Sequence, residues 1–230
     1  MCGIIAAASE RNVGKLLVQG LHKMEYRGYD SAGIALHQDD KIAHLRTLGK
    51  VKLLEEKMIS EKPRSKLGIA HTRWATHGEP SEENAHPHKS NERVYIVHNG
   101  IIENYLDLKD FLKKEGYSFS SQTDSELIAH MLEYFLSKDN TMLDAMYLTK
   151  EKLDGAYAIA AIDKEDDTNI IIARSKSPLL IGVGIDEFLA ASDPLAIGQL
   201  TNEFIFLEDG DVAEISSQSY TIYDESKNKV

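Results

Sequence analysis

The 230-residue sequence predicts an α+β protein in which two mainly antiparallel sheets pack on each other, with helices on the outside. The main observation is the order of the predicted elements, with most strands near the two ends of the chain and most helices in its middle. A second observation is the short apolar run at residues 4–8, which is typical of a buried strand. The length suits one large domain with a substantial core.

The first third of the chain alternates strands and helices. Apolar residues at helical spacing predict a helix from about residue 13 to residue 24. Two strands follow at 32–37 and 41–48, joined by a short polar hairpin loop. Helical periodicity returns at 51–59, and a short strand is expected at 67–73.

The middle of the chain contains a long loop and three helices. Residues 74–91 have almost no apolar periodicity, which indicates a functional loop. An alternating strand at 94–98 ends at an Asn-Gly pair, and a helix at 106–115 is followed by a glycine suited to its C-terminal cap. A second helix should begin at Thr123 or Asp124, because Glu126 completes a capping-box pattern with Thr123, and should run to Phe135. A third helix is expected at 142–153.

The remainder of the chain is predicted to be strands. They are expected at 156–162, 169–174, 179–183, 187–191, 203–207, 211–215 and 219–223. The predicted domain spans residues 1–224. Residues 225–230 are polar and are expected to form a tail or the start of a linker.

Composition excludes several classes of function. A formal net charge of −11 argues against a nucleic-acid or anionic-membrane surface. A single cysteine rules out an intramolecular disulfide framework, the N-terminus lacks the pattern of a signal peptide, and no apolar run is long enough to span a bilayer. The cytoplasm is therefore the expected location. No metal-binding motif, dinucleotide fingerprint or phosphate-binding loop occurs, so we expect neither a metal nor a cofactor.

The cysteine, Cys2, would become the N-terminal residue if Met1 were removed. Its free α-amine, with a reference pKa of about 7.7–8.0, could then accept the proton of its own thiol. Gly3 would leave room for a close approach of another group. The alternative is that Cys2 is a small buried apolar residue at an inert chain terminus.

Two further stretches contain residue types suited to amide chemistry. Residues 71–78 place Arg73, Trp74, Thr76 and His77 at the end of a predicted strand, where a guanidinium can bind a carboxylate and a loop can close over a ligand. The alternative there is a solvated strand end. Residues 98–100 could supply two oxyanion donors, one amide side chain and one glycine N–H, although Asn-Gly is also an ordinary turn signal.

Two charged residues remain ambiguous from the residues alone. Asp124 is suited either to capping a helix or to binding a ligand ammonium. Arg27 fits either a structural ion pair or the wall of a pocket.

Taken together, these stretches resemble the glutaminase domain of the class II glutamine amidotransferases, which belong to the N-terminal nucleophile hydrolases. The resemblance covers most of the chain in family order. It rests on CGI at 2–4, MEYRGYDSAGIA at 24–35, AHTRWATHGE at 70–79, NAHPH at 84–88, HNGIIENY at 98–105, TDSE at 123–126 and LDGAYA at 153–158. It implies a four-layer αββα fold.

The resemblance also implies a role for each candidate residue in hydrolysing the side-chain amide of L-glutamine. Cys2 would attack the amide, and Asn99 with the Gly100 N–H would hold the oxyanion. Arg73, with Thr76 and His77, would bind the substrate α-carboxylate, and Asp124 its α-ammonium. Trp74 would belong to a lid, Arg27 would lie near the nucleophile, and His71, His86 and His98 would support the site.

The members that this sequence resembles best continue into a sugar-phosphate isomerase half, which is not in this sequence, and the full-length enzymes are expected to be homo-oligomers. Two other functions stay open at this point. One is an N-terminal nucleophile hydrolase acting on a different amide. The other is a domain that binds glutamine without turning it over.

Overall fold

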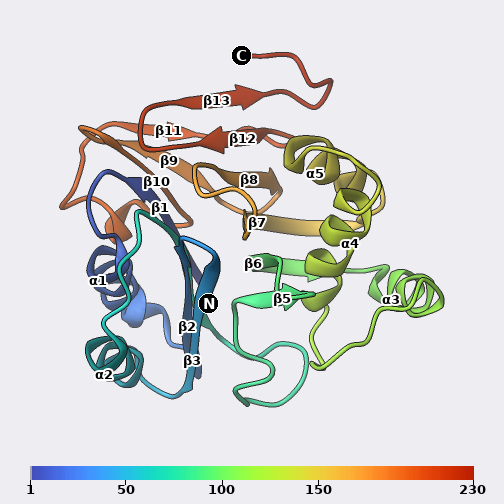
Figure 1. The fold of residues 1–230 in the computed structure, drawn as a ribbon, viewed down its shortest axis with the longest axis horizontal. Coiled ribbons are helices and arrows are strands. Elements are labelled where there is room, and N and C mark those ends of the chain that lie inside the picture. Colours follow the sequence, from blue (N-terminus) through green and yellow to red (C-terminus); the bar gives the residue numbers. More distant parts are fainter. Residues whose placement is uncertain (1) are drawn as a thin grey trace.

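The computed structural model describes residues 2–230 and forms two layers of sheet between two layers of helix (Figure 1). One sheet has seven strands in the order β11-β9-β10-β1-β4-β2-β3, and the other has six in the order β13-β12-β8-β7-β6-β5. Every pair of neighbouring strands in the two sheets is antiparallel. The predicted fold class is therefore confirmed.

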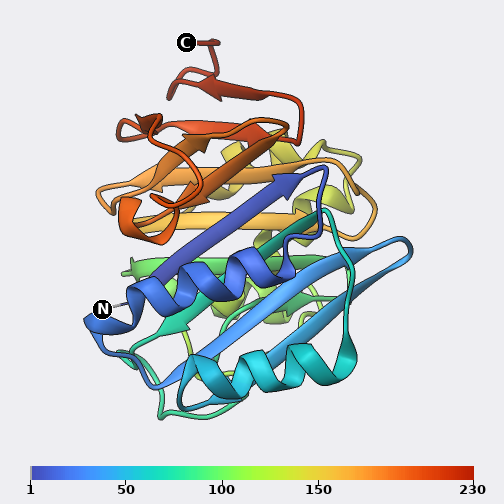
Figure 2. The same ribbon diagram turned by 90° about the vertical axis from the view of Figure 1, so that its left-hand side faces the viewer.

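The seven-stranded sheet is built from both ends of the sequence. Its strands are β1 (Gly3–Ser9), β2 (Ser31–Gln38), β3 (Lys41–Leu48), β4 (Leu67–Arg73), β9 (Leu180–Val183), β10 (Glu187–Ala191) and β11 (Phe204–Phe206). Helices α1 (Gly14–Met24) and α2 (Val51–Glu61) lie across its outer face (Figure 2).

The six-stranded sheet is covered by the other three helices. Its strands are β5 (His88–Ser90), β6 (Val94–Ile102), β7 (Gly155–Asp163), β8 (Ile170–Ser175), β12 (Val212–Ile215) and β13 (Tyr220–Tyr223). The helices are α3 (Tyr105–Lys114), α4 (Glu126–Leu136) and α5 (Met142–Lys150) (Figure 1). Short 3₁₀ turns, η1 (Glu25–Arg27) and η2 (Pro194–Ala196), complete the elements.

Strand β1 shows why the apolar run near the N-terminus is continuous. Ile4, Ala6 and Ala8 face the layer between the two sheets, whereas Ile5 and Ala7 face α1. Successive strand residues point to opposite faces, so a strand covered on both sides needs apolar residues at every position. β1 lies between β10 and β4, which places the strand that follows Cys2 in the interior of the sheet.

Four local predictions differ from the structure. The expected loop at 74–91 contains the short strand β5 near its end, and α5 ends at Lys150 rather than at residue 153. Strand β6 does not end at Asn99-Gly100 but continues to Ile102, because both residues pair with β7.

The predicted capping box is also wrong, because α4 begins at Glu126 and neither Thr123 nor Asp124 caps it. The hydroxyl of Thr123 lies 3.0 Å from His88 Nε2. The Glu126 carboxylate accepts hydrogen bonds from the backbone N–H groups of Ser120 and Ser121. A distant partner, His88, thus takes the Thr123 side chain, and backbone N–H groups earlier in the same loop take the Glu126 carboxylate.

Between Cys2 and Val230, no helix has both the length and the apolar composition that crossing a bilayer requires.

Candidate active site around Cys2

Cys2 lies immediately before β1, and the strand holds it against the neighbouring strands. The Ile4 N–H donates to Ser192 Oγ over 3.0 Å, and the Ser192 N–H donates back to the Ile4 carbonyl over 3.1 Å. At Gly3, an added Cβ would lie 2.7 Å from Met24 Sδ and 2.8 Å from Thr72 Oγ1. A side chain there would displace these groups, so the close approach expected at Gly3 is made by two neighbouring side chains.

The thiol of Cys2 contacts both backbone polar groups of Trp74, the N–H and the carbonyl oxygen. The Trp74 N–H donates to Sγ over 3.3 Å, and Sγ lies 3.6 Å from the Trp74 carbonyl oxygen. Burial raises the pKa of the thiol above its ordinary value, although the Trp74 N–H and the Arg73 charge act in the opposite direction. The thiol form therefore predominates at neutral pH, and an attack on an amide requires a base. Met1, on which the predicted α-amine base depends, lies outside the described residues.

Arg27 lies beside Cys2 and is also part of an ion pair. Its Nη1 donates to the Cys2 carbonyl over 3.3 Å, and its Nη2 lies 3.0 Å from Asp193 Oδ2. Tyr26 donates to the same carboxylate oxygen over 2.6 Å. Asp193 is not among the residues that the sequence pattern singled out. The signal that could have identified it is the pairing of the predicted strands at 4–8 and 187–191, because an antiparallel partner of β1 must end beside Cys2.

Asn99 is oriented by a buried histidine. The Nε2 atom of His71 lies 2.9 Å from Asn99 Oδ1 and 3.1 Å from the His98 carbonyl oxygen. Because both partners are acceptors, Nε2 carries the proton. Asn99 must then present its Nδ2 on the other side, where it donates to the Cys2 carbonyl over 3.3 Å.

Gly100 follows in β6 and must be glycine. Its φ of +141° is one that residues with a side chain rarely adopt, and an added Cβ would lie 1.9 Å from the Ala156 carbonyl oxygen. The residue is exposed at the mouth of the site, next to the Asn99 amide.

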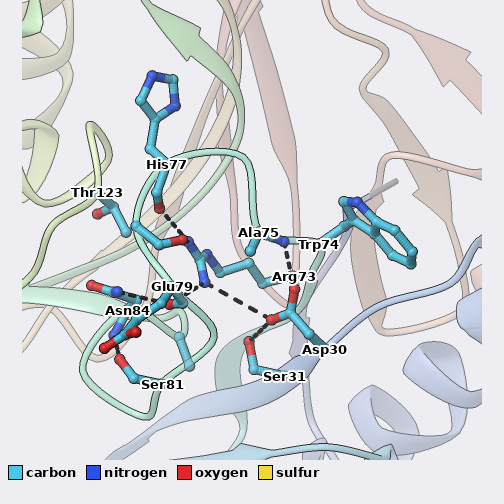
Figure 3. Close-up of polar contacts among 12 residues, drawn as sticks. Asp30, Ser31, Arg73, Trp74, Ala75, His77, Glu79, Ser81, Asn84 and Thr123 are labelled. Carbon is cyan, nitrogen blue, oxygen red and sulfur yellow. Dashed lines mark hydrogen bonds and ion pairs between the residues drawn. The ribbon is translucent and has the colours of Figure 1, made fainter.

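Arg73 ends β4, and its buried guanidinium holds the following loop (Figure 3). It donates to the carbonyls of His77, Gly78 and Glu79. Asp30 lies 3.8 Å from its Nη1 and also accepts from the Ala75 N–H. Asp30 was another residue that the sequence analysis did not single out, although it lies within the 24–35 stretch.

Trp74, Thr76 and His77 belong to this loop, and their surroundings are consistent with a lid. The Trp74 side chain is half exposed, and its ring lies over Gly28, where an added Cβ would come within 2.8 Å of it. The His77 ring meets Tyr105 edge to face at 5.7 Å. The loop is also held by Asn84, whose Nδ2 donates to the Glu79 carbonyl over 2.8 Å.

Asp124 is a buried carboxylate at the floor of the site. Its Oδ2 accepts a 2.8 Å hydrogen bond from the Ile102 N–H, which ties it to the end of β6. The neighbouring Ser125 hydroxyl lies 2.8 Å from His98 Nδ1. Asp124 is buried and lies two residues before α4, outside the N-cap position. These two features fit a carboxylate that binds a ligand better than one that caps a helix.

One small cavity connects most of the candidate residues. Its lining includes Cys2, Arg73, Trp74, Thr76, His77, Gly100 and Asp124. The two remaining candidates, Arg27 and Asn99, meet at the carbonyl of Cys2. The cavity volume is about 20 Å³, which holds about one water molecule, so an amino acid can enter only if some of the lining residues move apart.

The residues around Cys2 bring several kinds of functional group together. Within residues 2–230, no three His, Cys, Asp or Glu side chains are arranged to hold a metal ion. A thiol, an amide donor, a guanidinium and a carboxylate are the groups available. They suit acyl transfer from a substrate that carries both an acid and an amine.

The chain is similar to known proteins over its whole length. A family model described as a glutamine amidotransferase domain matches residues 71–199. The chain is 51% identical to glutamine–fructose-6-phosphate aminotransferase [isomerizing] from Haemophilus influenzae and 47% identical to that from Shewanella oneidensis. Each match covers all of this chain but only 38% of the relative, so the chain spans well under half the length of these proteins.

Solved structures agree on the fold. The glutamine phosphoribosylpyrophosphate amidotransferase of B. subtilis superposes with a TM-score of 0.84 at 26% identity, covering 99% of this chain and 50% of that one. A glutamine aminotransferase class-II domain protein from Silicibacter pomeroyi has the same fold, with a TM-score of 0.66 at 14% identity, covering 97% of this chain and 99% of that one. The family model spans more than half of the chain, and the chain therefore belongs to the glutamine amidotransferase domain family.

Proposed function

We propose that this chain hydrolyses the side-chain amide of L-glutamine to glutamate and ammonia, with Cys2 as the nucleophile. The observation that carries the proposal is the shared cavity, in which the Cys2 thiol lies with a buried cation, Arg73, and a buried anion, Asp124. A free α-amino acid carries the complementary pair of charges. A site that pairs both of them discriminates strongly against amides that lack either group.

The proposed reaction has two steps. The Cys2 sulfur attacks the amide carbon while the thiol proton passes to the α-amine of the processed chain and then to the leaving nitrogen, so that the C–N bond breaks and ammonia departs. Water then attacks the glutamyl thioester, and glutamate and the free thiol are released. The Asn99 Nδ2 and the Gly100 N–H stabilise the oxyanion in both steps.

The remaining candidate residues bind and enclose the substrate. Arg73, Thr76 and His77 would hold the α-carboxylate and Asp124 the α-ammonium. Trp74 would close the site, and Arg27 would fix the backbone of Cys2. Each of these roles is supported by a position in the cavity or by a contact with Cys2.

We further propose that residues 1–224 are the glutaminase domain of a longer protein, with residues 225–230 leading into a sugar-phosphate isomerase part. In that protein the ammonia would convert fructose 6-phosphate into glucosamine 6-phosphate in the cytoplasm, and the full-length enzyme would be a homo-oligomer. The support is the identity of about half of all residues to glutamine–fructose-6-phosphate aminotransferases over the whole of this chain.

A single assay tests both parts of the proposal. The chain, with Met1 removed, is incubated with glutamine and fructose 6-phosphate, and ammonia and amino sugar are measured separately. We expect ammonia without amino sugar. Amino sugar in the product would show that an acceptor site is present in this chain, and glutamine binding without ammonia would favour a binding domain.

Variants then assign the roles. Cys2→Ala should abolish turnover while glutamine still binds. Asp124→Asn should mainly raise KM, because the α-ammonium is bound equally in the ground state and the transition state. Equal turnover of glutamine and of amides without the α-ammonium would instead indicate a hydrolase for another substrate.

A further inference from the structure

Asp193 is fixed by its own backbone just beyond the end of β10. Ala191, the last residue of that strand, pairs with Ile5 in β1, and Asp193 continues in an extended conformation with φ −149° and ψ 125°. Its Oδ1 accepts from the Leu195 N–H over 3.0 Å, which caps the 3₁₀ turn η2. The strand and the cap together orient the carboxylate, and Oδ2 is the oxygen that binds partners outside this segment.

Arg27 and Tyr26 both bind Asp193 Oδ2. Arg27 Nη2 lies 3.0 Å from this oxygen, and the Tyr26 hydroxyl donates to it over 2.6 Å. The same hydroxyl accepts from Arg27 Nε over 3.4 Å, so the three side chains bind one another. Only 16% of the Arg27 side chain and 8% of the Asp193 side chain are exposed. Charge-assisted hydrogen bonds are stronger than neutral ones, and burial protects this pair from the screening that weakens exposed pairs.

The Cys2 carbonyl is the point where this group reaches the site. It accepts from Arg27 Nη1 and from Asn99 Nδ2, each over 3.3 Å. A carbonyl oxygen has two lone pairs, so both donors can bind it at once. An amide nitrogen carries two N–H groups, so Asn99 can bind Cys2 with one of them and an oxyanion with the other. The position of the Cys2 carbonyl therefore sets where this donor lies relative to the Cys2 sulfur.

We propose that Asp193 is a positioning residue for the amide hydrolysis, because it holds Arg27 against the Cys2 carbonyl and so keeps the thiol and the Asn99 amide in a fixed relative position. Without the carboxylate, Arg27 would lose the anion that orients it, and of these two donors only Asn99 would hold the Cys2 carbonyl. A misplacement of about 1 Å between reacting groups can cost about 10²-fold in rate. The kinetic consequence rests on the proposed glutaminase function, whereas the chain of contacts does not.

Asp193→Asn tests this role on the processed chain. An asparagine still caps η2 through its side-chain oxygen, but it has no charge and turns an NH₂ group toward Arg27. We expect kcat for glutamine to fall about 10- to 100-fold with little change in KM. The reason is that the proposed binders of the substrate charges, Arg73 and Asp124, lie on other elements.

Asp163→Asn is the matched control. Asp163 is a similarly buried carboxylate that lies 3.0 Å from Arg93 Nη2 and, like Asp193, accepts from the N–H two residues later. It pairs with Val94, at the opposite end of β6 from Asn99. We expect this variant to lose stability as Asp193→Asn does but to keep the wild-type kcat. Urea denaturation of both variants gives the comparison of stability.

A double-mutant cycle shows whether Asp193 acts through Arg27. In an Arg27→Gln background, Asp193→Asn should lower kcat by less than about 2-fold more, since the side chain through which it acts is already gone. Fully additive losses would overturn the proposal, because a merely structural carboxylate costs the same in both backgrounds. A wild-type kcat in Asp193→Asn, or a raised KM with unchanged kcat, would contradict it equally.

Crystal structures of the two variants separate this proposal from the proposed function. In Asp193→Asn the Arg27 guanidinium should leave the Cys2 carbonyl, and in Asp163→Asn this contact should remain. An unchanged contact in Asp193→Asn would refute the positioning role whether or not the chain hydrolyses glutamine. The expected structural difference in a chain that releases no ammonia would overturn the proposed function alone.

A second variant covers the case in which Asp193→Asn does not fold. Asp193→Ser also provides a capping oxygen for η2 and removes the charge, so the same kinetics and the same crystal structure apply to it. Failure of both variants to fold would show that the carboxylate is needed for the fold itself, and the positioning role would then be rejected.

Discussion

At the scale of single residues, the environment of Cys2 decides how it can react. Burial raises its thiol pKa, so a thiolate is not available at neutral pH without a base. Of the histidines that line the cavity, His86 and His98 are poor candidates for the base, because burial lowers the pKa of each. The α-amine of Cys2 itself has a reference pKa in the working range.

We therefore expect activity to require removal of Met1 and to rise with pH as the α-amine loses its proton. The rise should be centred near the reference pKa of about 7.7–8.0, since only the unprotonated amine can accept the thiol proton. Glutaminase activity is measured from about pH 6 to about pH 9 on chain whose mass shows Met1 removed, with unprocessed chain as the control. Equal activity of the two preparations would exclude the amine as the base.

Asn99→Ala should lower kcat by about 10²–10³ with a small change in KM, the usual cost of losing one oxyanion donor. Steady-state kinetics on glutamine provide the measurement. Asn104→Ala is a suitable control, because Asn104 bonds to the backbone around Lys152 and Asp154 and does not line the cavity. An unchanged kcat in Asn99→Ala would remove the residue from the mechanism.

At the scale of elements, β6 carries the two proposed oxyanion donors, Asn99 and Gly100, within a strand rather than on a turn. Asn99 pairs with Ala158 and Gly100 with Tyr157, so β7 fixes the backbone of both residues. A preorganised donor does not need to be ordered during the reaction, which is the physical advantage of this placement. The pairing with β7 also explains why glycine is required at position 100, because it places the Ala156 carbonyl oxygen where a Cβ would lie.

Gly100→Ala should destabilise the fold by more than about 3 kcal/mol, because backbone strain adds to a clash with a fixed carbonyl. Gly116→Ala is the matched control: its φ of +96° is also unfavourable, but nothing lies within 4 Å of the added Cβ. It should cost only about 1–2 kcal/mol. Urea denaturation of both variants gives the comparison, and equal losses would show that the strand relaxes around Gly100.

At the scale of the whole molecule, the seam between the sheets is lined by neutral histidines. Burial is the main cause that lowers the pKa of each, and they are His44, His71, His86, His88 and His98. In the unfolded chain the same residues bind a proton at about pH 6.5. The unfolded state therefore binds more protons than the folded state below that pH, and stability falls as the solution is acidified.

We expect the free energy of unfolding to fall between about pH 7 and about pH 5.5, by roughly 1 kcal/mol for each of these histidines. The carboxylates whose pKa is lowered, such as Glu126, lose their contribution only below their ordinary value of 4.5 and should not act in this range. His22 acts in the opposite sense: burial opposes its protonation, but Glu25 and Glu55 raise its pKa. Denaturant titrations at several pH values test the expectation. A free energy of unfolding that does not change with pH would mean that these histidines bind protons in the folded state as well.

Most of the architecture could be predicted from the sequence, because each element has a periodicity that depends only on its own residues. The apolar run of β1, the hairpin of β2 and β3 and the amphipathic helix α1 are found where their patterns predict them. Cys2, Arg73 and Asn99 were likewise identifiable as residue types suited to amide chemistry, whereas Asp124 and Arg27 stayed ambiguous until the family resemblance implied their roles. The sequence alone therefore determined the features that a local residue pattern indicates, namely the positions of these elements.

Only the tertiary structure decided which partner each polar group takes. Thr123 matches the first position of a capping box, yet its hydroxyl meets His88, a residue 35 positions earlier in the chain. Asn99-Gly100 has the composition of a turn but is held in a strand by β7. Asp193 reaches Arg27 from far along the chain. Hydrogen bonds and ion pairs form between whichever groups the packed sheets bring together, and that proximity is a property of the three-dimensional fold that sequence spacing does not contain.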